Sequence, residues 1–457
     1  MQVLRWISGF TLLAFVACSK GESNRSTDTT QTASSTATSN AACGGDNGGI
    51  TLPAGFCAVV FADTLGHVRH IAVNSNGDVY VNTWSGPYYQ GPTHPGGFIV
   101  ALRDTNNDGK ADIVRRFGPD VSQHNGGGTG IGFYKGALYA EEGDTAKKRI
   151  ARYTISTDSM TSTGAAQVVV DGLPANGDHP MHPFVIDGSG NLFMDVGSAT
   201  NSCQVKNRTL NSPGHTGCPE LQTRAGIWKY DANKTNQRFS GAERYATGIR
   251  NAVGIAFDPS GQLYSTQHGR DQLYDNWPKL YTSDQGQNLP AEELLRIEQG
   301  GDYGWPYCYF DNKQAKLVLA PEYGGDGGKA VGECATKKAP EAFFGAHWAP
   351  DGLMFYNGSM FPAHYKGGAF IAFHGSWNRA PGPQQGYFVV FVPYSGGKPV
   401  DPSKSEVFAD GFAGANKQPD AAAHRPTGLA QAPDGGIYIA DDKGGRIWKV
   451  VYRGTAK

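Results

Sequence analysis

The sequence predicts an all-β protein built as a six-bladed β-propeller. The 457-residue chain contains 63 glycines together with 22 Phe and 21 Tyr, a composition typical of strand-rich proteins with many tight turns. A short apolar run, a Gly-containing turn and a second β-rich run recur six times along residues 50–457. A third run with aromatic residues or Val follows most copies, as in "GYFVVFVPY" and "RIWKVVY". We expect each copy to form one blade.

In most of the six copies, residues alternate with period two on both sides of a turn, which predicts β-hairpins. They are "HIAVNSNGDVYVNT" (70–83), "GIGFYKGALYAEE" (130–142), "PFVIDGSGNLFMDVG" (183–197), "GIAFDPSGQLYSTQH" (254–268), "GLMFYNGSMF" (352–361) and "GLAQAPDGGIYIADD" (428–442). The fifth copy matches the pattern least well. The alternative, a pair of β-sandwiches, does not explain the self-similarity. The extra length between the fourth and sixth copies predicts long loops on one face, where propellers commonly carry their site.

The N-terminal region predicts export. Residues 1–18 read as a signal peptide, because the apolar run "WISGFTLLAFVA" is short for a membrane span. The pair Ala17–Cys18 resembles a bacterial lipobox, which implies an acylated Cys18 at the mature N-terminus; plain secretion with unmodified Cys18 is the alternative. Residues 19–48 are rich in Ser, Thr, Asn and Gly and predict a flexible tether. We therefore expect a propeller domain over 49–457, periplasmic or tethered to the outer membrane by lipid alone.

The net charge gives no indication of nucleic-acid binding, and the cysteine content favours disulfides. The formal net charge is −1, so no basic excess points to nucleic acid. Six cysteines remain beside Cys18, an even number that favours disulfides in an exported chain. The rival interpretation, a metal site, lacks any CxxC spacing. Among the possible connectivities, pairing neighbours along the chain is the simplest and gives Cys43–Cys57, Cys203–Cys218 and Cys308–Cys334.

Several loops, taken in order, resemble the glucose/sorbosone dehydrogenase family, six-bladed propellers that bind pyrroloquinoline quinone. They include "GHVRHIAVNSNGDVYV", "YATGIRNAVGIAFDPSGQLYSTQHGRDQL", "GAFIAFHGSWNR" and "HRPTGLAQAPDGGIYIADDKGGRIWKV". The resemblance covers roughly residues 50–453. It implies oxidation of an aldose, a pyranose or a sorbosone-like aldehyde, with hydride passed to the quinone. Calcium beside the quinone and an external electron acceptor, a quinone or a cytochrome, are implied as well.

The residues independently favour an external redox cofactor. The chain has no GxGxxG between a strand and a helix and no CxxCH haem motif. A quinone with three carboxylates would be bound by arginines, which pair with carboxylates in a bidentate manner. Arg69, Arg250 and Arg425 each stand just before a repeat hairpin, which would direct them to one face of the propeller.

The loop "NGDHPMHPF" before the third copy carries the candidate base. His179 is expected to take the proton of the sugar hydroxyl, because imidazole titrates near neutrality. Asp178 is expected to orient and stabilise it, as in other acid–histidine pairs. The alternative is a surface histidine beside a turn. His182, where relatives often carry Arg, either contacts cofactor or substrate or marks an altered site.

Four further loops supply candidate ligands through the resemblance. Cofactor contacts are expected at Arg250, Asn251, His374, Arg379 and Arg425, with His374 also a rival for the base. A structural Arg–carboxylate pair is the alternative for Arg250. The main-chain carbonyls of Gly269 and Arg270 would hold calcium, which prefers oxygen ligands, and the Arg270 side chain would then have to point away.

A second calcium candidate lies at "DTNNDGKAD". Asp104, Asn106, Asp108 and Asp112 take the spacing of the first part of an EF-hand loop. Arg115 stands where the final Glu is needed, so a true EF-hand is excluded. The choice remains between a structural calcium loop and an Asx-rich turn.

Two other readings of the function stay open at this point. One is a sugar-binding or interaction propeller without cofactor, and the other is a calcium-dependent lactonase. "GGDYGWPYCYF" (300–310) is either an aromatic sugar platform or propeller packing beside Cys308, of which packing is favoured.

Overall fold

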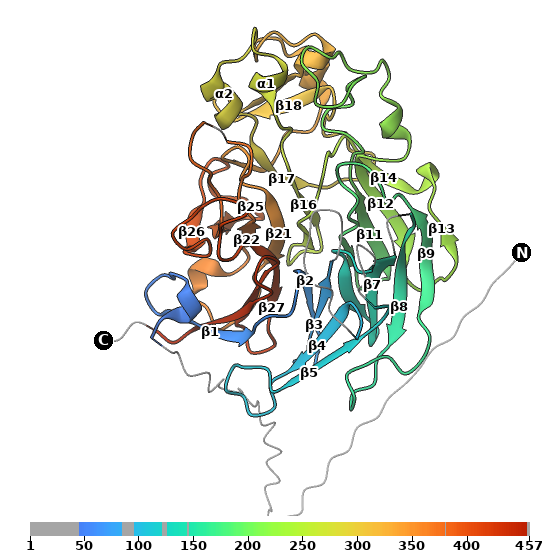
Figure 1. Cartoon of the computed structure of the whole chain (residues 1–457), viewed down its shortest axis with the longest axis vertical. Helices are drawn as coiled ribbons and strands as arrows, with labels where there is room; N and C mark the ends of the chain where they lie inside the picture. The colour runs from blue at the N-terminus through green and yellow to red at the C-terminus, as the bar shows by residue number, and fades with distance from the viewer. Residues whose placement is uncertain (1–44, 85–95, 121–125, 144–145, 380, 455–457) are drawn as a thin grey trace, which may run out of the picture. The chain divides into compact units, whose positions relative to one another are not determined.

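The computed structural model describes residues 45–84, 96–120, 126–143, 146–379 and 381–454 (Figure 1). These residues belong to one unit, Thr38–Lys457. The predicted signal peptide, Cys18, Cys43 and most of the predicted tether lie outside the described residues. The described chain enters the fold at a short 3₁₀ turn, η1 (Asn47–Gly49), where the Asn47 side chain accepts a hydrogen bond from the Ala58 amide.

Six four-stranded antiparallel sheets form the blades, and the first three follow the chain. Blade one contains β2 (Val68–Val73), β3 (Val79–Thr83), β4 (Ile99–Arg103) and β5 (Ile113–Phe117). Blade two contains β6 (Ile131–Tyr134), β7 (Ala137–Gly143), β8 (Lys148–Thr154) and β9 (Gln167–Leu173), extended by β13 (Gln237–Arg238). Blade three contains β10 (Phe184–Ile186), β11 (Asn191–Val196), β12 (Gly226–Asp231) and β14 (Arg244–Thr247).

The other three blades repeat the same order, and the last one uses both ends of the domain. Blade four contains β15 (Ile255–Phe257), β16 (Leu263–Gln267), β17 (Glu292–Arg296) and β20 (Ala342–Phe344). Blade five contains β21 (Pro350–Phe355), β22 (Ala369–Phe373), β23 (Phe388–Val392) and β26 (Glu406–Ala409). Blade six contains β27 (Pro426–Gln431), β28 (Ile437–Asp441), β29 (Ile447–Tyr452) and, as its outer strand, β1 (Phe56–Ala62).

The blades close into a ring. The inner strands β2, β6, β10, β15, β21 and β27 each contact the next, and β27 contacts β2. The predicted six-bladed propeller is therefore confirmed. The fifth repeat differs from its predicted hairpin, because its second strand is Ala369–Phe373 and not "NGSMF". Phe361 of that segment packs instead between Phe56 and Tyr356 in the core shared by blades five and six.

Two insertions on either side of β17 are drawn at the top of Figure 1. The one between β16 and β17 carries α1 (Leu273–Asn276) and α2 (Ser283–Asn288). The one between β17 and β20 carries β18 (Cys308–Asp311), β19 (Lys316–Leu319), η4 (Pro321–Tyr323) and η5 (Gly332–Thr336). Elsewhere the structure has η2 (Pro219–Gln222), η3 (Gly241–Glu243), η6 (Ala363–Tyr365) and the short pair β24 (Tyr394–Ser395) and β25 (Lys398–Pro399). In the part of the chain that the structure describes, no helix is long and apolar enough to span a membrane.

Two disulfides tie the loops above the ring. Cys203 is bonded to Cys218, and Cys308 to Cys334, as predicted. Trp305 is buried beside the first of them, so the "GWPYC" segment serves packing, the favoured reading. The predicted pair Cys43–Cys57 involves a residue outside the described ranges and stays a prediction.

Phe361→Ala is expected to destabilise the fold by about 3–5 kcal/mol, because it leaves a cavity among aromatic rings. Phe361→Leu fills most of that space and should cost clearly less. Chemical denaturation of the full chain measures the difference, with the exposed Val400→Ala as a control that should change stability by under about 0.5 kcal/mol. Equal losses for Phe361→Ala and Val400→Ala would contradict this packing.

Candidate active site

The candidate site is built from residues that follow the second strand of a blade. His268 follows β16, His374 follows β22, Asp442 follows β28, and Ser198 comes two residues after β11. Because the blades repeat one strand order around a ring, these strand ends meet at one face of the propeller.

His179 is buried, with 8% of its surface exposed, and its Nδ1 contacts two atoms of one residue. Nδ1 lies 2.9 Å from the Ser198 carbonyl oxygen and 3.0 Å from Ser198 Oγ. Ser198 Oγ donates its own hydrogen to the Thr200 carbonyl over 2.6 Å. Both atoms therefore act as acceptors, so Nδ1 carries the proton and Nε2 keeps its lone pair.

The approach of His179 to the third blade requires a glycine. A Cβ on Gly197 would come 2.6 Å from His179 Cβ. Burial, and then the positive charge of Arg250, hold the pKa of His179 well below its ordinary value. The imidazole is therefore neutral near pH 7 and able to accept a proton.

The predicted pairing of Asp178 with His179 is wrong: Ser198 holds the imidazole. Asp178 forms an ion pair with Arg208, whose Nη2 lies 2.9 Å from Oδ2. Arg208 also reaches Asp271 at 3.1 Å and lies over the exposed Trp377 ring. Asp178 thus fixes the loop that carries His179 and leaves the ring to Ser198.

Arg250 is buried and fully engaged beside His179. Its Nη2 lies 3.0 Å from Asp271 Oδ2, and its Nη1 donates to the Gly269 carbonyl at 3.1 Å. Burial alone would raise the pKa of Asp271, but the charges of Arg250 and Arg208 hold it below its ordinary value. Asn251, next in sequence, is buried too, and no described group hydrogen-bonds its Oδ1. An orphaned acceptor at this place fits a ligand that donates a hydrogen bond.

A second charged cluster joins blades one, four, five and six. Arg69 Nη1 lies 2.5 Å from Asp442 and 3.1 Å from Asp351. His374 Nε2 is 2.7 Å from Asp442, and His268 Nε2 is 3.1 Å from Asp351. Both ring nitrogens of His374 face carboxylates, Nε2 at 2.7 Å from Asp442 and Nδ1 at 3.7 Å from Asp351, so the ring is committed to this cluster.

Arg425 and Arg379 have different surroundings. Arg425 is half-buried, donates to the carbonyls of His374 and Gly375, and lies over the Tyr387 ring. It stands beside this cluster, and its contact with a cofactor stays a prediction. Arg379 is buried and donates to main-chain carbonyls, among them Pro383 at 3.2 Å, and to Asn288 Oδ1 at 3.2 Å. The structure thus uses Arg379 to fasten α2 and does not place it with the other arginines.

Gly269 and Arg270 were predicted to bind calcium through their main-chain carbonyls. The Arg270 side chain points away, into a buried ion pair with Glu322 at 2.5 Å. The Gly269 carbonyl gives one lone pair to Arg250 and has a second, so a main-chain calcium site fits these residues. Among the described residues, no group of three or more His, Cys, Asp or Glu side chains is placed to hold a metal.

The "DTNNDGKAD" loop is closed by its own hydrogen bonds. Asp112 accepts from the Thr105 amide and hydroxyl, and Asp104 from the Gly109 amide. Asn106 and Asp108 each accept a backbone amide two residues on. Most of these oxygens accept from donors within the loop itself, which is the geometry of an Asx-rich turn. Asp104 Oδ1 is buried with no described hydrogen-bond partner, and a structural calcium ion at this loop stays a prediction.

His182 lies inside the ring and not in the cluster around His179. Its Nδ1 is 3.1 Å from Glu141 Oε1, and Glu141 also accepts the Thr129 amide at 2.7 Å. Burial opposes the charge of Glu141, but Lys148 and the hydrogen bond from His182 lower its pKa to about 2. His182 therefore links blades two and three.

Sequence reasoning missed several residues that complete the site. They are Ser198, Asn201, Arg208, His268, Asp271, Asp351 and Asp442. His268 and Asp442 share one sequence signal with His374, because each residue directly follows the second strand of a blade.

Comparison with known proteins places the chain in a family. The family model described as TrAA12-like matches residues 50–453. The chain belongs to the TrAA12-like family. This agrees with the resemblance found in the sequence.

Curated relatives of this TrAA12-like chain match it in part. An uncharacterized protein of Borreliella burgdorferi is 32% identical over 215 residues, covering 46% of this chain and 49% of that protein. The pyrroloquinoline quinone-dependent pyranose dehydrogenase of Coprinopsis cinerea is 28% identical over 233 residues, covering 44% and 30%. The pyrroloquinoline quinone-dependent sugar dehydrogenase of Hypocrea jecorina is 25% identical over 319 residues, covering 65% and 67%. The chain thus spans half or less of the length of the first two.

Solved structures support the fold. A family AA12 carbohydrate-active enzyme of Trichoderma reesei superposes with a TM-score of 0.69 at 20% identity, covering 89% of this chain and 98% of that one. The pyrroloquinoline quinone domain of the Coprinopsis cinerea pyranose dehydrogenase, in its holo form, gives 0.66 at 21% identity, covering 88% and 97%.

Two buried acids lie beneath the Gly269 loop of this TrAA12-like propeller. Glu292 Oε2 accepts the Gly269 amide at 2.8 Å, and Glu293 Oε1 accepts from Gln267 at 2.9 Å. No described donor reaches Glu293 Oε2. Burial raises the pKa of Glu292 to about 7 and of Glu293 to about 8.

Glu293→Gln is expected to stabilise the protein at alkaline pH and to change little at about pH 5. The folded carboxyl keeps its proton up to about pH 8, whereas an unfolded Glu loses it near 4.5. Ionisation therefore penalises the folded state increasingly as pH rises between these values, and Gln escapes the penalty. Thermal unfolding across this pH range measures the gain.

The exposed Glu243→Gln serves as the control for Glu293→Gln, with no pH-dependent change expected. A Tm difference for Glu293→Gln that does not vary with pH would contradict the protonated state of this carboxyl.

Proposed function

We propose that the protein is a quinone-dependent sugar dehydrogenase that oxidises an aldose or pyranose and passes electrons to an external acceptor. The observation that carries the proposal is His179, a buried neutral imidazole with Nδ1 protonated and no hydrogen bond to Nε2 from the described residues, next to Arg250 and the orphaned Asn251 Oδ1. Membership of the TrAA12-like family and the likeness to the two fungal quinone-dependent dehydrogenases support it.

The residues present fit a quinone that carries carboxylates. Arg69, Arg250 and Arg425 bring three permanent positive charges to one face, and His374 stands between Arg69 and Arg425. The carbonyls of Gly269 and Arg270 would hold calcium. When bound, pyrroloquinoline quinone supplies the acceptor for hydride.

The chain's own residues then act on the sugar hydroxyl. His179 Nε2 accepts the hydroxyl proton, and the resulting imidazolium keeps its Nδ1 hydrogen on Ser198. The carboxylate of Asp271, held by Arg250, favours that positive charge. Burial keeps bulk water from competing for the base.

Reconstitution tests the proposal. The purified full chain is titrated with pyrroloquinoline quinone and calcium by absorbance, then assayed with a panel of aldoses and an artificial electron acceptor. We expect a saturable spectral change and sugar-dependent dye reduction. If the spectral change and the dye reduction are both absent, the proposal is overturned. Hydrolysis of lactones without quinone would replace it with a hydrolase.

His179→Ala is expected to lower kcat by about 10²–10⁴-fold, the contribution of a positioned general base, with quinone binding retained. The dye-linked assay measures it. His364→Ala is the matched control, since His364 lies half-exposed beside Glu406 and should leave kcat unchanged. Ordinary turnover by His179→Ala would remove this residue from the base role.

We also propose that the chain is exported and acylated at Cys18, on the strength of the lipobox-like end of residues 1–18. Expression in a bacterial host with labelled palmitate should label the wild type and leave Cys18→Ala unlabelled. An unlabelled wild type in the medium or periplasm would point to plain secretion.

A further inference from the structure

The loop that follows β11 connects the candidate base to the arginine beside it. Ser198 holds His179 Nδ1, and three residues later Asn201 holds Arg250. The Asn201 carbonyl accepts from Arg250 Nε at 3.0 Å, and its Oδ1 from Nη2 at 3.0 Å. A shift of this loop would therefore disturb both groups together.

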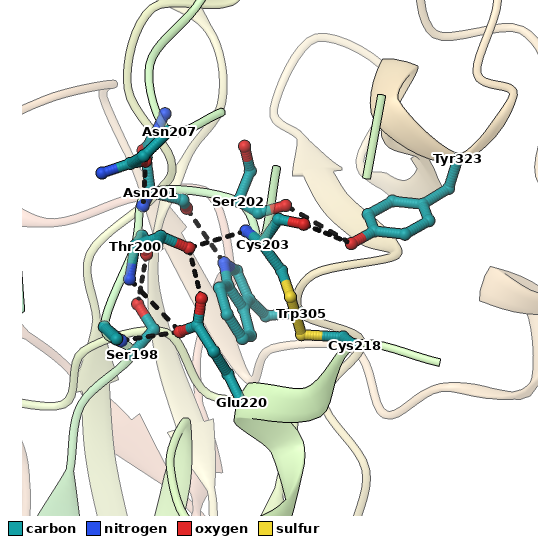
Figure 2. Close-up of a disulfide and its surroundings, with 11 residues drawn as sticks. Ser198, Thr200, Asn201, Ser202, Cys203, Asn207, Cys218, Glu220, Trp305 and Tyr323 are labelled. Atoms are coloured by element: carbon teal, nitrogen blue, oxygen red, sulfur yellow. Dashed lines mark hydrogen bonds between the residues drawn. A yellow bond between two sulfur atoms is a disulfide. The ribbon is translucent and has the colours of Figure 1, made fainter. Parts of the chain in front are cut away.

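Glu220 fastens the loop between these two points (Figure 2). One carboxylate oxygen accepts the Ala199 amide at 2.6 Å and the Thr200 amide at 3.2 Å, and the other accepts the Thr200 hydroxyl at 2.5 Å. Three hydrogen bonds to one charged acceptor hold this loop more strongly than the single hydrogen bond of an ordinary turn. Glu220 has no part in the proposed chemistry, yet it fixes the residue after Ser198 and the one after that.

A disulfide and a tryptophan hold Glu220 and the loop in register. Glu220 lies in η2, which begins one residue after Cys218, and Cys218 is bonded to Cys203. The Cys203 amide donates to Thr200 Oγ1 at 2.9 Å, so the same threonine joins both anchors (Figure 2). Trp305 packs on the disulfide and donates to the Asn201 carbonyl at 3.0 Å.

We propose that Glu220 is a positioning residue that keeps the proton of His179 on Nδ1, acting through Thr200 and Ser198. Glu220 fixes Thr200, and the Thr200 carbonyl takes the hydroxyl hydrogen of Ser198. Ser198 Oγ is thereby left as an acceptor toward Nδ1. Once Thr200 is released, the Ser198 hydroxyl is free to turn and donate to Nδ1, which moves the ring proton to Nε2 and blocks the base.

The proposal is tested by the histidine ¹⁵N spectrum of the full chain, which distinguishes the two tautomers without any cofactor. His179→Gln identifies the signal. We expect the Nδ1–H form in the wild type and an admixture of the Nε2–H form in Glu220→Ala. The surface control Glu243→Ala should match the wild type. An unchanged spectrum in Glu220→Ala would overturn the proposal.

A double variant separates this role from simple loop collapse. Ser198→Ala removes the rotating hydroxyl but keeps the Ser198 carbonyl, which only accepts. In Glu220→Ala/Ser198→Ala the Nδ1–H form should therefore return. A double variant that stays like Glu220→Ala would mean that the loop has merely come apart, and would overturn the proposal.

Activity adds a second readout that rests on the proposed function. In the reconstituted enzyme Glu220→Ala should lose about 10-fold or more in kcat, with KM nearly unchanged, because the base and not the sugar contacts is disturbed. A rise in KM at constant kcat would contradict it. If the wild type oxidises no sugar, the proposed function fails, while the ¹⁵N result still decides the role of Glu220.

Discussion

The pairing of β1 with β29 is the interaction on which the molecule depends. It places the first strand of the propeller at the outside of the last blade, with Phe56 opposite Tyr452. With this pairing β1 covers the edge that β29 would otherwise leave unpaired and completes the fourth strand of blade six. It also brings β2 against β27, so that Arg69 of blade one meets Asp442 of blade six and Asp351 of blade five.

Charge compensation shapes the site that this closure assembles. A buried arginine is tolerated only with a partner, and here Arg69 has Asp351 and Asp442, while Arg250 and Arg208 share Asp271. The face is therefore organised before any ligand arrives. Carboxylates hold Arg69, Arg250 and Arg208 in place, and the main-chain carbonyls of His374 and Gly375 hold Arg425.

The fold was predictable because it repeats. Alternation with period two and a Gly-containing turn are visible in most of the copies. Arg69, Arg250 and Arg425, each just before a predicted hairpin, lie among the residues of the candidate site. The fifth hairpin failed because Phe361 was counted as a strand residue, whereas it fills the core between two blades.

The partners of the site residues were less predictable. Asp178 is next to His179 in sequence, but the backbone turns it toward Arg208, and the imidazole finds Ser198, nineteen residues on. Arg379 lies in the "FHGSWNR" motif, but its guanidinium donates to main-chain carbonyls and not to the site. In the "DTNNDGKAD" loop the carboxylate spacing suits a metal, but the same spacing suits backbone amides, from which Asp104 and Asp112 accept. Such choices are decided by packing, which no local pattern records.

The shared sixth blade also bears on how the chain is made. The strand that completes it is among the first parts of the propeller to leave the ribosome, and its partner is among the last. Until β29 arrives, β1 has no neighbour to hydrogen-bond and shows a bare edge. The ring can therefore lock only after synthesis is nearly finished, and a nascent chain must be kept from pairing that edge with another copy.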